Sequence, residues 1–591
     1  MKKNILLGVV VGFSYYAGVG QADQNQSYVI NKTYTSEQQS AVASIQGTQT
    51  SISYVDPYGR RIQSKLLNYS PDGRPLVLGV SYNEFGKEDI SYLPYTNSVN
   101  ETYEFDNNSI ANQLNFYTNA PLVAHDNFPY INIEYDNSPV NFIRSAESIG
   151  DFWHDNSVTD NAVSAVKMTN GTGNSTLTMF GELDLVKYWE ESNGAYISTT
   201  DYSENELVGY LTQSPEHATE VSFTDKQGKL ICKKIADVEN ARLLTTYYVY
   251  NENGLLSCII TPKAYRNMQL QTTYSTTVVT EDLLYRYTYD KSGRLISKKI
   301  PGKEKTEFVY DNLNRVILQQ DGNLRGNDKW IFYKYDILGR LVLQGVYENA
   351  QILTQDGMQI AANTHNTTNP NYETASNFQY NDFFGYTSQS FPELIDASLG
   401  IATYNGGATY AYQPIQANFE VLYASYYDNY DFDQNGTSDY NYMNSPYSNN
   451  VPAINNKNRL TGTTVKKVGD TGYLEQTYFY NFNAGRLIQT AERDLDKGII
   501  NLTNFEYNFV GNVIHSTKLH VFGANAHSIV NRYTYDSQNR LVKTYQKMDG
   551  DPEIVLSEIV YNRLGQPIIK KLNSNNDDGN YLQNIDYEYH I

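Results

Sequence analysis

A cluster of oxygen-bearing side chains in the second half of the chain could bind a calcium ion. Asp431, Asp433, Asn435 and Asp439 place carboxylate or amide oxygens at alternate positions around Gly436. Calcium loops hold their ion with oxygen ligands spaced in this way around a glycine turn. The glutamate that such a loop carries at its twelfth position is absent, and a tyrosine stands there. The segment is therefore either a calcium site or a solvated turn in a stretch rich in Asn and Asp.

Other side chains with catalytic potential are scattered along the chain. His515, His520 and His527 are five and seven residues apart, which places neighbours on opposite faces of a strand, so we interpret them as surface or wall residues. Glu134 and Asp136 share a strand face, as the two carboxylates of a glycosidase would. In a chain with 65 acidic residues, however, such pairs arise by chance. Signatures of metalloproteases, serine hydrolases and nucleotide-binding loops are not found, so we expect neither an enzyme nor a cofactor, calcium apart.

The two cysteines, Cys232 and Cys258, occupy equivalent positions, each four residues after a glycine. An exported protein with two cysteines invites a disulfide. If the chain folds into successive β-hairpins, as the repeat described below predicts, equivalent positions in neighbouring hairpins lie two strands apart, at roughly 9.5 Å. Cα atoms joined by a disulfide are rarely more than about 7 Å apart. The sequence leaves the pairing open, and a disulfide would indicate that the hairpins pair in another way.

A short sequence motif that begins with tyrosine, which we call the phrase, recurs through the chain. The structure that it forms must position these side chains. It reads YTYDKSGRLI at Tyr287–Ile296 and returns in three close copies and several looser ones. In the last five copies the second tyrosine recurs every 26 to 28 residues, a period typical of stacked repeats. The second tyrosines of these five copies are Tyr480, Tyr507, Tyr535, Tyr561 and Tyr589.

Each phrase predicts a β-hairpin. Alternate aromatic residues form the first strand, an acidic residue opens the turn by accepting hydrogen bonds from the following backbone, and glycine supplies the left-handed backbone conformation. Where glycine is missing, Asn314 and Asn539 replace it, and asparagine is the residue with a Cβ that best tolerates positive φ. The residues assigned to the repeat motif are Tyr289, Asp290, Gly293, Arg294, Tyr310, Asp311, Arg315, Tyr335, Asp336, Gly339, Arg340, Tyr535, Asp536 and Arg540.

Tyrosine is by far the most frequent aromatic residue, with 54 copies against 22 Phe and 3 Trp. Its ring offers apolar area while its hydroxyl needs a partner, which suits a wall that is half packed and half wet. The arginine that follows the turn glycine has two interpretations. It either lies across an aromatic ring of the neighbouring hairpin, or it is a surface cation near acidic turns.

The phrases resemble the YD-repeat (Rhs) family, which includes bacterial Rhs proteins, insecticidal toxin-complex shell subunits and teneurin ectodomains. The likeness covers about 220–345 and 473–591. It implies a long β-strip that spirals into a hollow shell, and in bacterial members such a shell commonly encloses a C-terminal toxin. The segments Tyr54–Ser64 and Asp72–Glu88 are similar to the leader region before the repeats in long exported Rhs proteins. The family's C-terminal core segment has no counterpart here, and the chain stops five residues into a new phrase, so we expect the N-terminal part of a longer protein.

The first residues are typical of an export signal. Lys2 and Lys3 precede an apolar segment, Ile5–Phe13, and small residues follow up to Ala22. Together with the resemblance, this predicts a protein that is secreted or lies at the surface or in the periplasm of a Gram-negative bacterium. The net charge of -20 is unfavourable for binding nucleic acid or anionic lipid. We expect no membrane span after signal cleavage.

These observations predict an all-β protein in which hairpins stack into a curved or spiralling strip, a partial YD-repeat shell. The resemblance favours a non-enzymatic wall that encloses or delivers a C-terminal polypeptide absent from this chain. The first alternative is a surface adhesin or glycan-binding protein that uses the tyrosine-rich strip, and the second is an enzyme acting on polysaccharide. The expected divisions are a signal peptide (1–22), a flexible polar lead (23–50), an irregular β-rich region (51–210), a first repeat block (211–350), an irregular insertion with an Asn- and Tyr-rich loop (351–472) and a second repeat block (473–591).

Overall fold

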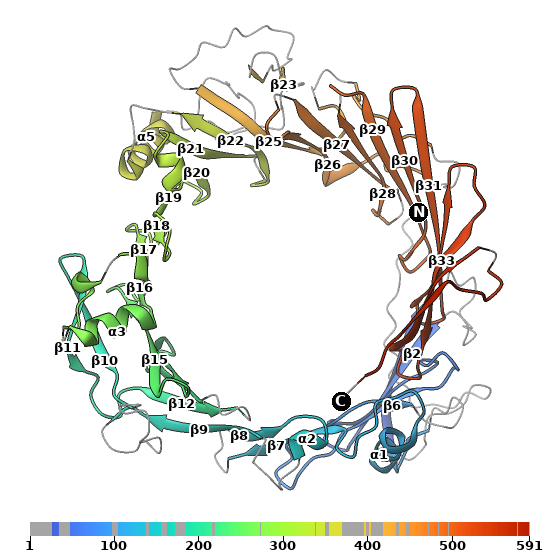
Figure 1. Cartoon of the computed structure of the whole chain (residues 1–591), viewed down its shortest axis with the longest axis horizontal. Coiled ribbons are helices and arrows are strands. Elements are labelled where there is room, and N and C mark those ends of the chain that lie inside the picture. Colours follow the sequence, from blue (N-terminus) through green and yellow to red (C-terminus); the bar gives the residue numbers. More distant parts are fainter. Residues whose placement is uncertain are drawn as a thin grey trace.

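In this computed structural model, antiparallel strands follow one another around a ring (Figure 1). The expected all-β architecture is confirmed. The structure describes residues 26–34, 48–96, 104–136, 141–154, 162–171, 184–214, 219–271, 273–279, 281–336, 338–348, 354–368, 395–396, 401–402, 418–432, 437–444, 450–470, 472–482, 484–494, 496–575 and 577–589.

One antiparallel strip forms most of the ring, and nearly every strand in it pairs with its neighbours in sequence. Hairpins are its unit because each phrase carries its own turn signal between two strands of alternating pattern. The strands of the strip are β5 (Ile90–Tyr92), β7 (Tyr130–Tyr135), β8 (Ile143–Glu147), β9 (Val163–Thr169), β12 (Val208–Gln213), β13 (Thr219–Thr224), β14 (Leu230–Asp237), β15 (Arg242–Tyr250), β16 (Leu256–Ile260), β17 (Leu284–Tyr289), β18 (Leu295–Lys299), β19 (Thr306–Tyr310), β20 (Val316–Gln320), β21 (Lys329–Tyr335), β22 (Leu341–Glu348), β25 (Asn418–Asp428), β26 (Asn456–Lys466), β27 (Tyr473–Tyr480), β28 (Leu487–Asp494), β29 (Ile499–Tyr507), β30 (Val513–Phe522), β31 (Asn525–Tyr535), β32 (Leu541–Met548), β33 (Ile554–Tyr561), β34 (Pro567–Ser574) and β35 (Gln583–Asp586).

A second sheet at the N-terminus has the strand order β1-β2-β3-β4-β6. Its members are β1 (Ser27–Tyr34), β2 (Thr48–Val55), β3 (Arg61–Leu66), β4 (Leu76–Gly79) and β6 (Tyr95–Thr96). Two small hairpins stand apart from the strip, β10 (Lys187–Ser192) with β11 (Ala195–Asp201) and β23 (Ile395–Asp396) with β24 (Ile401–Ala402). The helices are α1 (Ser109–Asn119), α2 (Asp151–His154), α3 (Pro262–Leu270), α4 (Gly322–Arg325) and α5 (Gln355–Thr368), with 3-10 turns η2 (Thr276–Val278) and η3 (Glu281–Leu283).

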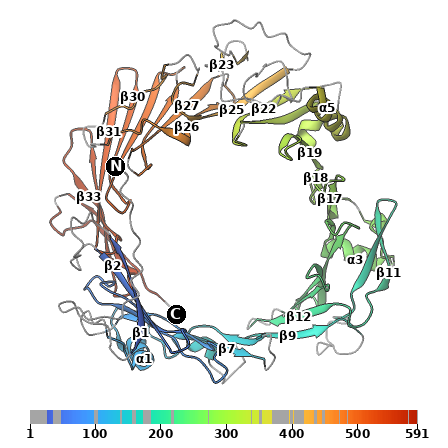
Figure 2. The same cartoon turned by 180° about the vertical axis from the view of Figure 1, so that it is seen from behind.

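The apolar clusters of the strip lie on its outer side. The hairpin β10–β11 and the helix α3 cover β13–β17 from outside, and α5 covers β19–β22 in the same way (Figures 1 and 2). Under α3, the ring of Tyr247 contacts Trp189 and Tyr265 at 5.4 and 5.0 Å between centroids. Under α5, Met358 and Trp330 are fully buried in one cluster. These short covering elements therefore bury the outer face of a strip that could not enclose a core alone.

The tyrosines of the repeat phrases lie on the opposite face of the strip. Successive side chains of a strand point to opposite faces, and Tyr247 faces outward, so Tyr248 and Tyr250 face the centre of the ring. Cross-strand partners share a face, and the register carries this orientation along the strip, for instance from Tyr333 through Gln344 to Tyr423. The phrase tyrosines are partly buried, apart from Tyr587 in the last phrase, which is exposed. The predicted wall, half packed and half wet, is confirmed.

Two of the expected divisions are wrong. Residues 27–34 lie in the segment expected to be a flexible lead, yet they form β1, which pairs with β2 along its whole length because Tyr28 and Ile30 alternate and pack near Tyr54. The segment 351–472 is not wholly irregular, because β25 and β26 continue the strip within it. The expected signal peptide lies outside the described residues. No helix in the described part of the chain is both long enough and apolar enough to cross a membrane.

Candidate functional site

The acidic residue of each phrase organises its own turn, as predicted. Asp311 accepts hydrogen bonds at Oδ1 from the backbone N–H groups of Leu313 (3.0 Å) and Arg315 (2.9 Å). Its Oδ2 accepts from Nε of Arg315 at 2.7 Å, and the side chain is only 3% exposed. Asn314 adopts a φ of 63°, the conformation for which glycine or asparagine was predicted. The same contacts recur at Asp290, Asp336 and Asp536.

These hydrogen bonds also affect the charge of the acid. Burial alone would raise the pKa of the Asp290 carboxyl, but hydrogen bonds from the backbone and the guanidinium of Arg294, together with one from the Ser292 N–H, hold that pKa below its usual range. The carboxylate therefore stays ionised at neutral pH and remains available to the arginine.

In the phrase and its three close copies, the arginine reaches beyond its own hairpin while it pairs with its own turn. The guanidinium carbon of Arg315 lies 5.0 Å from the centre of the Tyr335 ring, and Arg294 lies at the same distance from Tyr310. The interpretation that the arginine lies across a ring of the neighbouring hairpin is confirmed. The arginine is also paired with the acidic turn, but it is not a surface cation, because the side chains of Arg294 and Arg315 are only 21% and 16% exposed. Further contacts between an arginine and a ring join Arg340 to Tyr427, Arg459 to Tyr480, Arg486 to Tyr507 and Arg540 to Tyr561.

The hydroxyl of the second tyrosine makes another contact between hairpins. Near the turns, adjacent hairpins separate; β16 and β17, for example, pair only between Cys258 and Ile260 on β16. The carbonyl of Leu256 would then lack a backbone partner, and Tyr289 supplies one by donating its hydroxyl at 2.9 Å. The same bond joins Tyr250 to Leu230, Tyr310 to Leu295, Tyr335 to Val316, Tyr427 to Leu341, Tyr480 to Leu460, Tyr507 to Leu487, Tyr535 to Val513, Tyr561 to Leu541 and Tyr589 to Pro567.

One repeat escaped the sequence analysis because a long insertion divides its phrase. Tyr427 and Asp428 end β25, and the second half of the phrase, Asn458-Arg459-Leu460, stands in β26. Tyr427 pairs with Leu460 in register, Asn458 has a φ of 66°, and its N–H donates to Oδ1 of Asp428. Residues 429–457 are therefore inserted at the tip of an otherwise ordinary hairpin. The sequences YYD at 426–428 and NRL at 458–460 match the two halves of the phrase and could have indicated this repeat.

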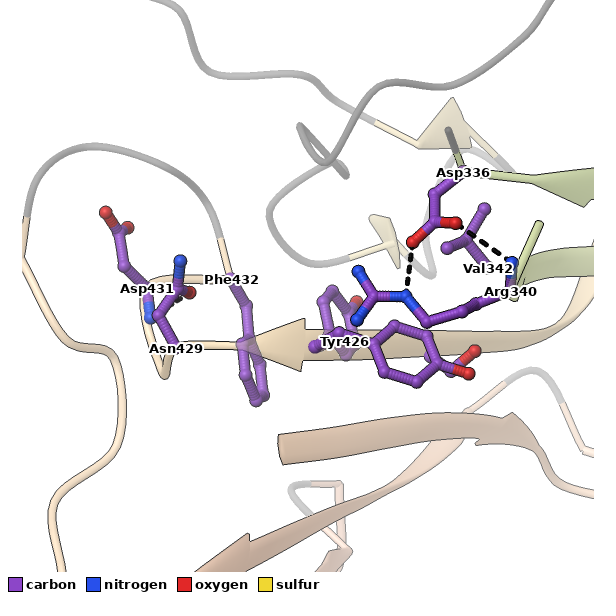
Figure 3. A pocket seen from close by; sticks show the side chains of 9 residues that line it. Asp336, Arg340, Val342, Tyr426, Asn429, Asp431 and Phe432 are labelled. Carbon is purple, nitrogen blue, oxygen red and sulfur yellow. Dashed lines mark hydrogen bonds and ion pairs between the residues drawn. The ribbon is translucent and has the colours of Figure 1, made fainter. Parts of the chain in front are cut away.

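The divided repeat borders a small pocket between β22 and β25 (Figure 3). There Arg340 bonds to Asp336 at 2.6 Å and to Asp428 at 2.8 Å. The rings of Tyr426 and Phe432 stack with centroids 4.1 Å apart. The pocket is lined by Asp336, Arg340, Val342, Ser425, Tyr426, Tyr427, Asn429, Asp431 and Phe432.

The calcium candidate falls largely outside the described residues, which omit Asp433, Asn435 and Gly436. Oδ2 of Asp439 accepts a hydrogen bond from the N–H of Phe432 at 2.6 Å. Asp431 lies apart from the ion pair of Arg340 and Asp336 (Figure 3). In the described part of the chain, three or more His, Cys, Asp or Glu side chains nowhere gather as metal ligands would. The calcium site stays a prediction.

Glu134 and Asp136, the acidic pair, each have a local partner. Glu134 accepts hydrogen bonds from Arg144 at 3.3 Å and from Ser145 at 2.9 Å. Asp136 lies just beyond β7 and accepts from the N–H of Phe142 across the turn at 3.1 Å. Both carboxylates thus hold the β7–β8 hairpin together.

The interpretation of the three histidines is wrong in one respect. His515 and His520 do lie on opposite faces of β30. His520 and His527, however, are directly opposite each other in the β30–β31 register and share a face. Spacing along one strand does not apply to this pair, because the turn at Gly523 lies between them.

The two cysteines are free and buried. Cys232 on β14 and Cys258 on β16 lie on either side of β15, opposite Tyr247 and Val249 respectively, so they are two strands apart as the repeat predicts. Burial raises the pKa of each thiol to about 12.

The N-terminal sheet contacts the last hairpins and completes the ring (Figures 1 and 2). The hydroxyl of Tyr69 donates to the carbonyl of Leu564 at 3.3 Å, and Leu564 packs against the apolar cluster around Tyr95. We call this contact the seam. Other seam contacts join Gln538 to Asn68 and Gln49, Asn562 to Leu122, Arg563 to Asp72 and Arg540 to the ring of Tyr69.

The seam also contains a mainly apolar pocket of about 400 Å³. Most of its wall comes from the N-terminal region, and Leu564, Gln566 and Tyr589 close it from the last repeats. Contacts of this kind connect residues more than four hundred positions apart, which explains why no local pattern indicated them.

Comparison with known proteins gives a partial match. A domain family described as a domain of unknown function (DUF6443) matches residues 26–166. No curated protein matches the sequence. Two solved structures are similar, each at 12% sequence identity. The crystal structure of TcdB2-TccC3-TEV is matched over 95% of this chain and 30% of that one, with a TM-score of 0.37. The crystal structure of TcdB2-TccC3 without its hypervariable C-terminal region is matched over 92% and 22%, with a TM-score of 0.35. The chain thus spans less than a third of the length of either structure.

Proposed function

We propose that this chain is a non-catalytic section of an Rhs-type shell wall, exported from the cell, which surrounds a polypeptide. The observation that supports this proposal most strongly is that the polar side chains of the phrase are already bound to other parts of the strip. The aspartate is bound by its own turn, and the arginine is bound by that aspartate and by the next ring. The tyrosine hydroxyl is bound by a neighbouring carbonyl. Side chains engaged in this way hold hairpins together and are not free to act on a substrate.

The inward face supports enclosure of a polypeptide rather than of an apolar ligand. Tyr333 on this face bonds to Gln319, and Tyr533 bonds to Ser516. A surface of half-exposed phenol rings, amides and hydroxyls offers hydrogen bonds and flat contacts at many points. Such a lining suits a chain that must be held without being bound tightly at one place.

Cross-linking from the two faces of one strand tests this proposal. A photoreactive phenylalanine analogue replaces Tyr533, which faces the centre, or its neighbour Thr534, which faces outward, in protein made from its native gene. We expect the inner position to cross-link to a polypeptide encoded by the same or an adjacent gene, and the outer position to remain unlinked. Equal cross-linking from both positions, or none from the inner one, would contradict enclosure.

Export is tested separately by N-terminal sequencing of protein recovered outside the cytoplasm. The signal pattern predicts a mature chain that begins after Gly20 or Ala22. A chain that keeps Met1 and stays inside the cell would contradict export. It would not contradict the proposal that the chain forms a section of a shell wall.

A glycan-binding function is the second candidate, and the first tyrosines of the phrases are the rings that would serve it. An arginine already lies over the second tyrosine of most phrases, so the first tyrosines, such as Tyr287 and Tyr533, offer the freer rings for stacking on a sugar. A glycan array distinguishes the two functions. Saturable binding that is lost in Tyr533→Ala and kept in Thr534→Ala would favour recognition of sugars.

A further inference from the structure

We infer that the tip of the β30–β31 hairpin binds a divalent late transition-metal ion, such as Zn²⁺, between His520 and His527. The two residues are directly opposite each other in the antiparallel register. Directly opposed residues have Cβ atoms about 5 Å apart and project to the same side of the sheet. Imidazole nitrogen is a preferred ligand of Zn²⁺, Cu²⁺ and Ni²⁺.

Hydrogen bonds fix the proton of the His520 ring on Nδ1. Nδ1 lies 2.6 Å from Oδ1 of Asn501, which belongs to the adjacent strand β29. The amide of Asn501 cannot turn freely, because its Nδ2 donates to Oε1 of Glu492 at 3.0 Å. Its oxygen must therefore face the histidine and accept a hydrogen bond from the Nδ1–H group. In the neutral ring, the lone pair is then on Nε2.

The His527 ring is held in the same way from the other side. Its Nδ1 lies 3.1 Å from Oδ2 of Asp549, just beyond β32. The other carboxylate oxygen of Asp549 accepts from the N–H of Ser528 at 2.6 Å. Because a backbone N–H occupies one carboxylate oxygen of Asp549, its Oδ2 remains as the acceptor that faces the His527 ring. A carboxylate or carbonyl on the far nitrogen is the usual support of a metal-binding histidine.

The anchors also direct the two free nitrogens toward each other. The strand order is β29-β30-β31-β32, so Asn501 holds His520 from one side of the hairpin and Asp549 holds His527 from the opposite side. The two nitrogens of an imidazole point in nearly opposite directions across the ring. With each Nδ1 directed outward, each Nε2 is directed to the middle of the hairpin. Neither Nε2 has a hydrogen-bond partner within the described part of the chain.

Two imidazoles leave coordination positions for water, because both side chains are exposed. The site has two protein ligands, whereas a structural zinc site has four. It lies on the same face as the inward tyrosines, since His527 and Tyr533 are separated by an even number of residues on β31. A bound ion would tie together the ends of two of the longer strands of the strip.

Titration calorimetry with Zn²⁺ alone, on the full chain without a polyhistidine tag, tests the inference. We expect saturable binding at pH 7.5 that is abolished in His520→Ala and in His527→Ala. Asp549→Asn keeps both ligands and should weaken binding by about 10- to 100-fold, the usual effect of removing such a support.

His515→Ala is the matched control. This residue lies on the same strand and also holds an oxygen with Nδ1, that of Glu506 at 2.8 Å, but it belongs to the opposite face. Binding should be unchanged in this variant. The absence of zinc binding by the unaltered protein, equal loss in the His515 variant, or full binding without His520 would each overturn the assignment. Hydrogen exchange of the hairpin tip provides a second measurement, because zinc should slow it only in proteins that keep both ligands.

Discussion

Replacing Asp311 separates the contribution of the turn from that of the ion pair. The carboxylate is 3% exposed and accepts two backbone hydrogen bonds and one from the Arg315 guanidinium. Asp311→Ala removes all of them and leaves a guanidinium that is 16% exposed without its anion. Loss of one partner from a buried pair costs about 3 to 5 kcal/mol. Because Arg315 and the turn can still reach some water, we expect the lower end, about 3 kcal/mol.

Asp311→Asn should cost less, because an amide can still organise the turn. At Asn562 the amide oxygen accepts from the N–H groups of Leu564 and Gln566, both at 3.0 Å, as the aspartates do elsewhere. The asparagine variant loses the charge-assisted bond to the guanidinium, which is worth about 2 kcal/mol. The order of stability should therefore be aspartate, asparagine, alanine.

Hydrogen exchange of the β19–β20 hairpin measures both effects locally, which suits a large repeat protein better than a global unfolding curve. At 1.36 kcal/mol for each factor of ten, exchange should be about 150-fold faster in Asp311→Ala and about 30-fold faster in Asp311→Asn. Asp536 makes the same contacts but is 19% exposed, so Asp536→Ala should have a smaller effect. Equal exchange rates in the two Asp311 variants, or a larger effect at Asp536, would refute the reasoning.

Tyr289→Phe should destabilise the β16–β17 contact by about 1 kcal/mol, since a carbonyl of β16 loses its donor. Tyr287→Phe on the same strand should change the stability of this contact by less than about half of that. Hydrogen exchange of β16 and β17 measures the effect of both variants. Leu564→Asp should open the seam and increase the radius of gyration measured by small-angle X-ray scattering, while Leu313→Asp, at an equivalent but 51% exposed turn position, should not. The pKa of the Asp290 carboxyl is lower in the folded state than its ordinary value of 3.8. The carboxylate therefore stabilises the fold above that pH, and this stabilisation is lost as the pH falls below it. Hydrogen exchange of the β17–β18 hairpin should accordingly respond less to acid in Asp290→Asn. Both cysteine thiols should resist alkylation at pH 8 until the protein unfolds, because burial raises their pKa to about 12 and excludes the reagent; intact mass after treatment with iodoacetamide checks this.

The hairpins could be predicted from the sequence because their determinants are local. The acidic residue, the glycine or asparagine and the alternating aromatic residues of a phrase lie within ten positions, and they act on each other directly. Asp290, Gly293 and Arg294 therefore occupy the predicted places in the turn. The half-buried state of the tyrosines followed from the chemistry of the side chain alone.

The features that the sequence did not reveal depend on contacts between residues far apart in the chain or on the register of two strands, and a short local motif specifies neither. The pairing of His520 with His527 required the position of a turn, which fixes the register of the two strands. The divided repeat required recognition of Asp428 and Asn458 as halves of one phrase. The seam depends on the curvature of the whole strip, which brings Tyr69 to Leu564. Curvature accumulates from small rotations between many strands, and a short motif does not specify it.

The divided repeat has a consequence for how such a protein changes length. Its strand pairing, its aromatic contact with Arg340 and its phenol bond to Leu341 all persist although residues 429–457 separate the two halves of the phrase. Material added at a hairpin tip therefore leaves the spacing of neighbouring strands unaltered. Foreign peptides, affinity tags or whole modules could be grafted at these tips, and natural lineages could diversify one rim of the molecule while its circumference stays the same.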